Sequence, residues 1–124
     1  MIMINIEKSN TSPEIIMEQN PDIMRIEGES YPENAFQFYA PVFEWFHTQF
    51  PLLDEFVLEV RLSYMNSTST KCILDILDIL NEASTEGKKI QVRWFYQKDN
   101  SRALDLAEEF KEDLQLPFEL IAYE

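Results

Sequence analysis

Four consecutive hydroxyl residues stand between Asn66 and Lys71, and they are Ser67, Thr68, Ser69 and Thr70. A serine or threonine hydroxyl on a surface turn can accept a phosphoryl group, which adds roughly −1.5 to −2 charges at neutral pH. At the start of a helix, unpaired backbone N–H groups and the helix dipole both favour an added anion. Lys71 would lie within the first helical turn, where it could partly neutralise a phosphate. The pattern therefore indicates a candidate phosphoacceptor site.

The same residues also have a simpler interpretation as helix caps. Asn, Ser and Thr before a helix commonly accept hydrogen bonds from the N–H groups of its first turn. No acidic residue stands three positions after Ser67 or Thr68, so neither completes a capping box, and the segment has more hydroxyls than capping needs. Capping and phosphorylation both remain open on this pattern alone.

The segments on either side predict that the hydroxyl run joins a strand to a helix. Before it, one apolar face repeats every second residue, as in a strand, and that face consists of Phe56, Leu58, Val60, Leu62 and Tyr64. After it, apolar residues recur at helical spacing, and they are Ile73, Ile76, Leu77 and Leu80. Asn66 would then position the turn, with Ser69, Thr70 and Lys71 as neighbours of a phosphate.

The rest of the chain alternates between strand and helix patterns. Strands are predicted over residues 1–7, 14–18, 23–27, 90–97 and 117–123, with a hairpin turn at 19–22 and a break at Gly28. A first helix is predicted to begin at Pro32 and end before Pro51, and a third helix follows Ser101. The first helix is expected to turn one aromatic-rich face inward, made of Phe36, Tyr39, Val42, Phe43 and Phe46.

The predicted order of elements is β-β-β-α-β-α-β-α-β. We expect one α/β domain spanning residues 1–124, with a mixed sheet and the N-terminal hairpin at one edge. The lone His47 is expected at the surface near the end of the first helix, and Cys72 near the start of the second.

Composition argues against several classes of function. The chain has 10 Lys and Arg against 23 Asp and Glu, a net charge of −13, which disfavours nucleic acids and anionic membranes and favours a basic partner surface. The two glycines cannot form a Walker or dinucleotide loop, and one His with one Cys cannot form the usual zinc sites. We therefore expect no enzyme activity, cofactor or metal. The absence of a signal peptide pattern or a long apolar run predicts a cytoplasmic protein.

The segment from Arg61 to Asp75 reads R-L-S-Y-M-N-S-T-S-T-K-C-I-L-D. It resembles the phosphoacceptor turn of the SiaC family of bacterial regulatory phosphoproteins, whose fold is similar to STAS-domain anti-sigma-factor antagonists. G-E-S-Y-P-E-N from Gly28 and the closing V-R-W-F-Y, L-A-E-E-F-K-E-D and P-F stretches also agree with the family. In the family pattern the hydroxyl directly after the Asn accepts the phosphoryl group, which implies Ser67. The best-known member has Thr followed by Ser there, and the reversed order here makes Thr68 the reserve acceptor.

The resemblance implies a non-catalytic switch protein in cyclic di-GMP signalling and biofilm formation. Its partners would be a serine/threonine kinase, a PP2C-type phosphatase that reverses the modification, and a diguanylate cyclase that the unmodified form activates. Two alternatives remain. One is a STAS-type anti-sigma-factor antagonist acting on an anti-sigma kinase, although Asn66 stands where such domains commonly have Asp. The other is a ligand-binding module that uses the aromatic helix from Phe36 to Phe46.

Overall fold

The computed structural model describes residues 3–19 and 21–124. Its elements, in chain order, are β1 (Asn5–Ile6), β2 (Glu14–Glu18), β3 (Ile23–Ser30), α1 (Ala35–Thr48), the short 3-10 helix η1 (Phe50–Leu52), β4 (Glu55–Met65), α2 (Ser67–Thr85), β5 (Lys89–Gln97), α3 (Ser101–Glu112) and β6 (Phe118–Tyr123). The predicted order of strands and α-helices is confirmed. The strand expected over residues 1–7 is observed only as β1, and residues 1 and 2 lie outside the described part of the chain.

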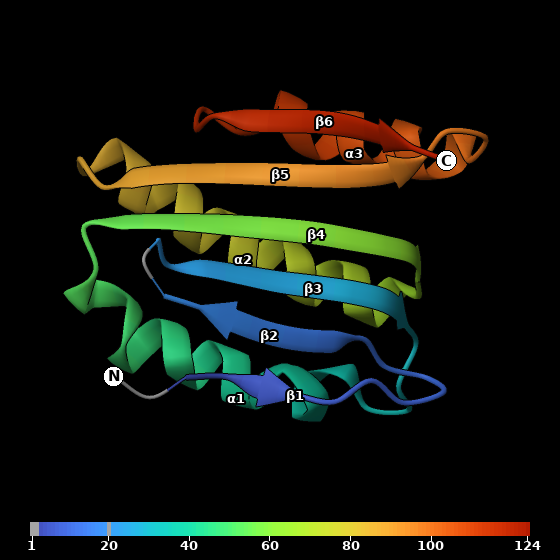
Figure 1. Ribbon diagram of the computed structural model, residues 1–124, viewed down its shortest axis with the longest axis horizontal. Coiled ribbons are helices and arrows are strands. Elements are labelled where there is room, and N and C mark those ends of the chain that lie inside the picture. The colour runs from blue at the N-terminus through green and yellow to red at the C-terminus, as the bar shows by residue number, and fades with distance from the viewer. Residues whose placement is uncertain (1–2, 20) are drawn as a thin grey trace.

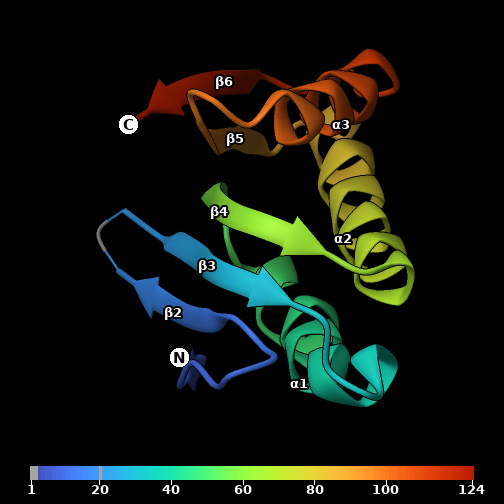
Figure 2. The same ribbon diagram turned by 90° about the vertical axis from the view of Figure 1, so that its right-hand side faces the viewer.

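The six strands form one sheet in sequence order, from β1 at one edge to β6 at the other. The first three strands are antiparallel to one another, and β3 to β6 are parallel. Figure 1 shows the sheet in front of the helices, and Figure 2 shows that α1, α2 and α3 all cover the same face. The expected α/β class, the mixed sheet and the N-terminal hairpin at its edge are therefore confirmed.

The third strand continues past the residue at which the sequence predicted its end. Gly28 lies within β3 and has a φ of 128°, a conformation open to glycine at little cost. The register with β4 shifts directly after it, because Gly28 is opposite Leu62 whereas Glu29 is opposite Tyr64. This is a β-bulge, with Ser63 as the extra residue. Gly28 thus bends a strand that continues to Ser30, and the predicted strand end at this residue was wrong.

The bulge also corrects the predicted inner face of β4. Leu62 is buried as expected, but Tyr64 is 53% exposed. An extra residue reverses the alternation of side chains along a strand, so Tyr64 points to solvent although its period-2 position predicted burial. The bulge thereby places an aromatic ring on the surface three residues before Ser67.

The first helix begins later than its sequence pattern indicated. It also turns a different set of side chains toward the core. Asn34 caps it by accepting the Gln37 N–H at 3.1 Å, so Pro32 lies before the helix. Phe36 is 57% exposed, and Trp45 is buried in its place. The Trp45 ring contacts the rings of Phe46, Phe50 and Phe56, with centroids 5.1 to 6.2 Å apart. This aromatic packing turns the helix and leaves Phe36 facing solvent.

The second and third helices agree more closely with the sequence pattern. The four α2 residues predicted to face inward are all buried, and they are Ile73, Ile76, Leu77 and Leu80. In α3, Ala107 and Phe110 are buried while Ala103 and Leu106 are partly exposed. His47 is exposed in the last turn of α1, where a cationic imidazole would suit the helix dipole. The core thus lies between the helices and one face of the sheet.

Candidate functional site

The turn before α2 lies where two parallel strands end side by side. Ser30, the last residue of β3, is opposite Met65, the last residue of β4, and the Asn66 N–H donates to the Ser30 carbonyl at 3.0 Å. Asn66 then caps α2, because its Oδ1 accepts the Ser69 N–H at 2.9 Å. Its backbone carbonyl accepts the Thr70 N–H at 2.9 Å. The strand ends and the cap together fix the backbone on both sides of Ser67.

The four hydroxyls of the run have different surroundings. Thr70 Oγ1 donates to the Asn66 carbonyl at 2.9 Å, and the Ser69 side chain is fully buried. Ser67 and Thr68 make no side-chain hydrogen bond to the described residues, and Ser67 is exposed whereas Thr68 is half-buried. Asn66 alone supplies the side-chain cap. The Ser67 hydroxyl is therefore not needed to form the helix, and it is the most accessible of the four.

Beneath the turn, three buried hydroxyls form a cluster that joins three elements. Ser30 Oγ lies 2.8 Å from the Tyr39 hydroxyl and donates to Ser69 Oγ at 2.8 Å, which links β3, α1 and α2. We call Ser30, Tyr39 and Ser69 the hydroxyl cluster. Burial raises the pKa of Tyr39 to about 12, so its phenol stays neutral near pH 7. Ser69 was expected beside a phosphate, but its hydroxyl points into this cluster and away from the exposed turn.

The sequence does not indicate that these three hydroxyls lie together. Its members are 9 and 39 residues apart along the chain, so no local spacing connects them. Ser30 lies in the G-E-S-Y-P-E-N stretch, Ser69 in the hydroxyl run and Tyr39 on the predicted inner face of the first helix, but nothing in the sequence joins the three. The cluster fixes the first turn of α2 through the Ser69 side chain, and Asn66 fixes it through the Ser69 backbone N–H.

The electrostatic surroundings of Ser67 suit an added anion. Ser69 and Thr70 donate their amides to Asn66, which leaves the Ser67 and Thr68 N–H groups without an acceptor among the described residues. Such free amides at a helix start favour a phosphate. Lys71, one turn further on, pairs with Asp75 at 2.8 Å, and this hydrogen bond raises the pKa of the exposed Lys71 ammonium.

The Cys72 thiol lies near the turn but, unlike the Ser67 hydroxyl, is not accessible. Cys72 is buried, and burial raises the pKa of its thiol. A buried thiol with a raised pKa is a poor nucleophile, because the thiolate is the reactive form. Cys72 is therefore a core residue of α2 and contributes no chemistry to the exposed turn.

Several exposed apolar side chains lie near this turn, although the most exposed one among the described residues, Leu52, lies in η1 before the start of β4. Tyr64 on β4 and Tyr31 just after β3 meet edge to face, with centroids 5.9 Å apart, and are 53% and 39% exposed. Phe36 is exposed on the first turn of α1. Leu74, 37% exposed, lies two turns along α2 on the same side as Ser67. Exposed apolar side chains gathered in one region are typical of a protein interaction surface.

Comparison with known proteins identifies the family of the chain. The model of the SiaC family, described as regulatory phosphoproteins, matches residues 6–123. The chain belongs to the SiaC family. A protein of Pseudomonas aeruginosa strain UCBPP-PA14 is 35% identical over an alignment of 126 positions that covers 98% of this chain and 97% of that protein. Membership in the SiaC family places the chain among regulatory proteins and not among enzymes.

Solved structures of SiaC proteins share the whole fold. SiaC of Pseudomonas aeruginosa is 33% identical and superposes with a TM-score of 0.91, over 99% of this chain and 100% of that one. A second match is a crystal structure of diguanylate cyclase SiaD in complex with its activator SiaC, also from Pseudomonas aeruginosa. That match has 34% identity and a TM-score of 0.92, over 97% of this chain and 99% of the other. In the described part of this SiaC family chain, no helix is both long and apolar enough to cross a membrane.

Proposed function

We propose that this chain is a phosphorylation-controlled activator of a diguanylate cyclase, with Ser67 as the phosphoacceptor. The observation that carries the proposal is the accessibility of the Ser67 hydroxyl. It is exposed and free of hydrogen bonds to the described residues, at the centre of a turn that Asn66 already caps. Thr68 is half-buried and serves as the reserve acceptor.

The partner class follows from the solved complex of a similar protein. SiaC of Pseudomonas aeruginosa, which shares this fold, is the activator of diguanylate cyclase SiaD in that complex. We assign the same class of partner to this chain, with a serine/threonine kinase and a PP2C-type phosphatase controlling Ser67. The setting would be the cytoplasm, where the kinase finds ATP and the cyclase finds GTP.

A phosphate on Ser67 would act by changing the surface that the cyclase contacts. The exposed rings of Tyr31 and Tyr64 lie at the same strand ends as Ser67, and an apolar contact there requires the removal of water. A phosphate adds roughly −1.5 to −2 charges that hold water and repel acidic groups of a partner. The unmodified form therefore binds the cyclase, and the phosphorylated form releases it.

The first test maps the modification. The protein is purified from its own cells with phosphatases inhibited, and its intact mass and peptides are measured. We expect one phosphoryl group on Ser67, absent from Ser67→Ala. Ser101→Ala is the matched control, because Ser101 also opens a helix directly after a capping asparagine, Asn100, and is also exposed. Phosphate on Thr68 would correct the site, and its absence under several growth conditions would count against the switch.

The second test measures binding to the cyclase. Immobilised Ser67→Ala should capture a diguanylate cyclase from the cell lysate, identified by mass spectrometry, and Ser67→Asp should bind the purified cyclase at least about tenfold more weakly. Gln115→Glu adds the same single charge at an exposed position beyond α3 and should bind as the wild type does. Equal affinities of Ser67→Ala and Ser67→Asp, or recovery of an anti-sigma kinase and no cyclase, would contradict the proposal.

A further inference from the structure

The sheet splits beside the Ser67 turn, and the split opens a pocket. β4 and β5 are paired only as far as Val60 and Trp94, although β4 continues to Met65 and β5 to Gln97. β4 stays with β3, and the first half of α3 borders the gap. The resulting pocket has a volume of about 370 Å³. This is the size of cavities that hold small ligands or large side chains, roughly 300 Å³ and above.

The lining of this pocket combines an apolar interior with a cationic rim. The side chains of Leu62, Trp94 and Leu106 make its walls apolar, and Arg102 and Asn100 contribute from the start of α3. Leu62 and Trp94 belong to the core and are 4% and 1% exposed. A rigid apolar floor under a polar rim is the usual form of a pocket that receives an anchor side chain from a protein partner.

Arg102 differs from the other arginines of the chain in lacking an acidic partner. Arg25, Arg61 and Arg93 each form an ion pair with a glutamate. Arg102 forms none with the described residues and is exposed, in a chain that has 23 acidic side chains. An unpaired guanidinium beside an apolar pocket is complementary to a carboxylate, which arginine can bind through two parallel hydrogen bonds.

Tyr64 and Met65 make the pocket continuous with the proposed switch. Both line the pocket, and the Tyr64 ring also meets Tyr31 at the exposed end of the sheet. Ser67 follows Met65 by two residues, which the chain spans in at most about 7 Å. A charge placed on Ser67 would therefore act on a group seated against Met65 in the pocket, since the screening length in the cell is about 8 Å.

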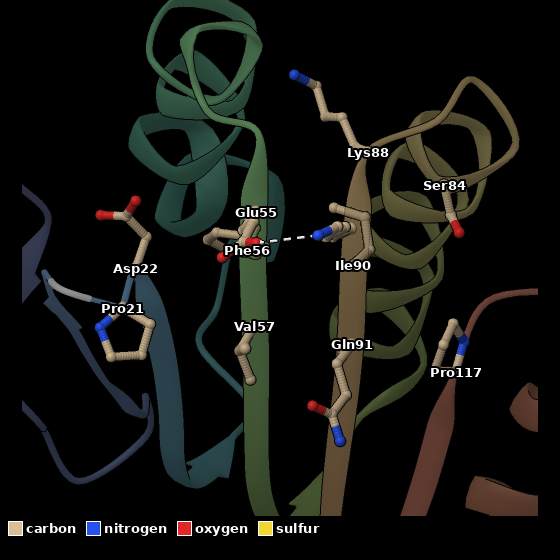
Figure 3. A pocket seen from close by; sticks show the side chains of 11 residues that line it. Pro21, Asp22, Glu55, Phe56, Val57, Ser84, Lys88, Ile90, Gln91 and Pro117 are labelled. Carbon is tan, nitrogen blue, oxygen red and sulfur yellow. Dashed lines mark ion pairs between the residues drawn. The ribbon is translucent and has the colours of Figure 1, made fainter.

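A larger pocket at the opposite end of the sheet lacks this combination. It has a volume of about 440 Å³ and is lined by the first residues of β4 and β5. Its cations have partners within the molecule: Lys89 pairs with Glu55 at 3.6 Å, and Lys88 donates to the carbonyls of Pro51 and Leu53. Figure 3 shows the Glu55 ion pair across the pocket and Lys88 pointing away from it. The two lysines that line this pocket are therefore already paired within the chain, unlike Arg102.

We propose that the pocket between β4 and α3 receives an apolar side chain of the diguanylate cyclase, and that Arg102 pairs with a carboxylate next to that side chain. The inference rests on the proposed function and names the surface through which it operates. It also gives the phosphate a specific target, because a carboxylate attracted by Arg102 is repelled by a phosphate on Ser67. Phosphorylation then weakens the contact that Arg102 strengthens.

The test uses the full-length chain and the cyclase captured by Ser67→Ala. Ala103→Phe fills the pocket from its α3 side and keeps the backbone N–H that donates to Oδ1 of Asn100, the residue that caps the helix. Arg102→Glu reverses the charge at the rim. We expect each variant to bind the cyclase at least about tenfold more weakly. The far-ultraviolet circular dichroism spectrum should be unchanged, because the fold is retained. Lys111→Glu makes the same charge change at the exposed far end of α3 and should bind as the wild type does.

The outcomes separate this inference from the function on which it rests. If Ser67→Asp loses the cyclase while Arg102→Glu and Ala103→Phe bind within about twofold of the wild type, the pocket assignment is overturned and the switch stands. If Lys111→Glu is as weak as Arg102→Glu, the effect is one of total charge and the assignment also fails. If the wild-type chain and Ser67→Ala bind no diguanylate cyclase, both the function and the pocket assignment fall.

Discussion

Two polar regions of this molecule are built in opposite ways. The hydroxyl cluster beneath the Ser67 turn is neutral and fully buried. On the sheet face that carries no described helix, Glu59 instead accepts hydrogen bonds from Arg25 at 2.7 Å and from Arg93 at 3.0 Å, and Arg25 also pairs with Glu18. The Glu59 side chain is 14% exposed, but the two arginines are 43% and 35% exposed. We call these four residues the charged network.

The difference indicates which part of the structure must be rigid. A buried hydroxyl that loses its partner costs about 1–3 kcal/mol, because water cannot replace the lost hydrogen bond. Exposed ion pairs contribute only about 0–1 kcal/mol, since water and salt screen them. The hydroxyl cluster therefore holds the start of α2 in one geometry, whereas the charged network keeps the open sheet face hydrated and less prone to nonspecific association.

The largest expected effect comes from the central hydroxyl of the buried cluster. Ser30→Ala removes the partner of both Tyr39 and Ser69, so we expect the free energy of unfolding to fall by at least about 2 kcal/mol in urea titrations. Ser63→Ala is the matched control, because Ser63 is exposed on the neighbouring strand and its hydroxyl makes only a 3.4 Å contact with the Gly28 carbonyl. The control should lose less than about 0.5 kcal/mol. Equal losses would remove the distinction between buried and exposed hydroxyls.

Tyr39→Phe should lower the free energy of unfolding by less, about 1 kcal/mol, because Ser30 keeps Ser69 as a partner.

The same variant tests whether water is excluded from the hydroxyl cluster. The pKa of Tyr39 is about 12 in the folded state and about 10 when unfolded, so its contribution is present below pH 10 and is lost as the pH rises toward 12. The wild type should therefore lose more stability than Tyr39→Phe between about pH 9 and pH 11. If the wild type and Tyr39→Phe lose the same stability over this pH range, water reaches the Tyr39 phenol.

The periodic parts of the fold could be predicted because burial is periodic along them. The inward residues of α2 and the alternation of β4 up to Leu62 follow the helix and strand repeats, and these were correct. Tyr64 and Phe36 were predicted to be buried and are exposed. A bulge opposite Gly28 moves the first, and the packing of Trp45 against other rings rotates the helix that carries the second. Both causes are tertiary contacts, which a local pattern does not contain.

The candidate site divides in the same way. The Ser67 turn could be found because its hydroxyls are consecutive and lie between a strand pattern and a helix pattern. The hydroxyl cluster and the Arg102 pocket could not, because each joins residues more than 30 positions apart that only the folded sheet brings together. Arg102 also gives no signal in the sequence, since its lack of an acidic partner depends on where the glutamates lie in space.

The smallest expected effect belongs to the charged network. Burial opposes ionisation of Glu59, but hydrogen bonds from Arg25 and Arg93 outweigh it and lower the pKa of Glu59 below its ordinary value of 4.5. Because the folded-state pKa is lowered, the contribution is present above about pH 4.5 and is lost as the pH falls further. Glu59→Gln should therefore cost no more than about 1 kcal/mol at pH 7, after allowance for solvent screening of its exposed partners.

That cost should also shrink in salt and in acid, which distinguishes it from the cost of breaking the hydroxyl cluster. Urea titrations of Glu59→Gln in about 0.05 M and about 1 M NaCl, and near pH 7 and pH 4, measure both dependences. Glu119→Gln is the control, because Glu119 is exposed on β6 and makes only a 3.4 Å contact with Gln91. A salt-independent loss as large as that of Ser30→Ala would show that the open face is held as rigidly as the turn, since only groups shielded from water escape the screening by salt.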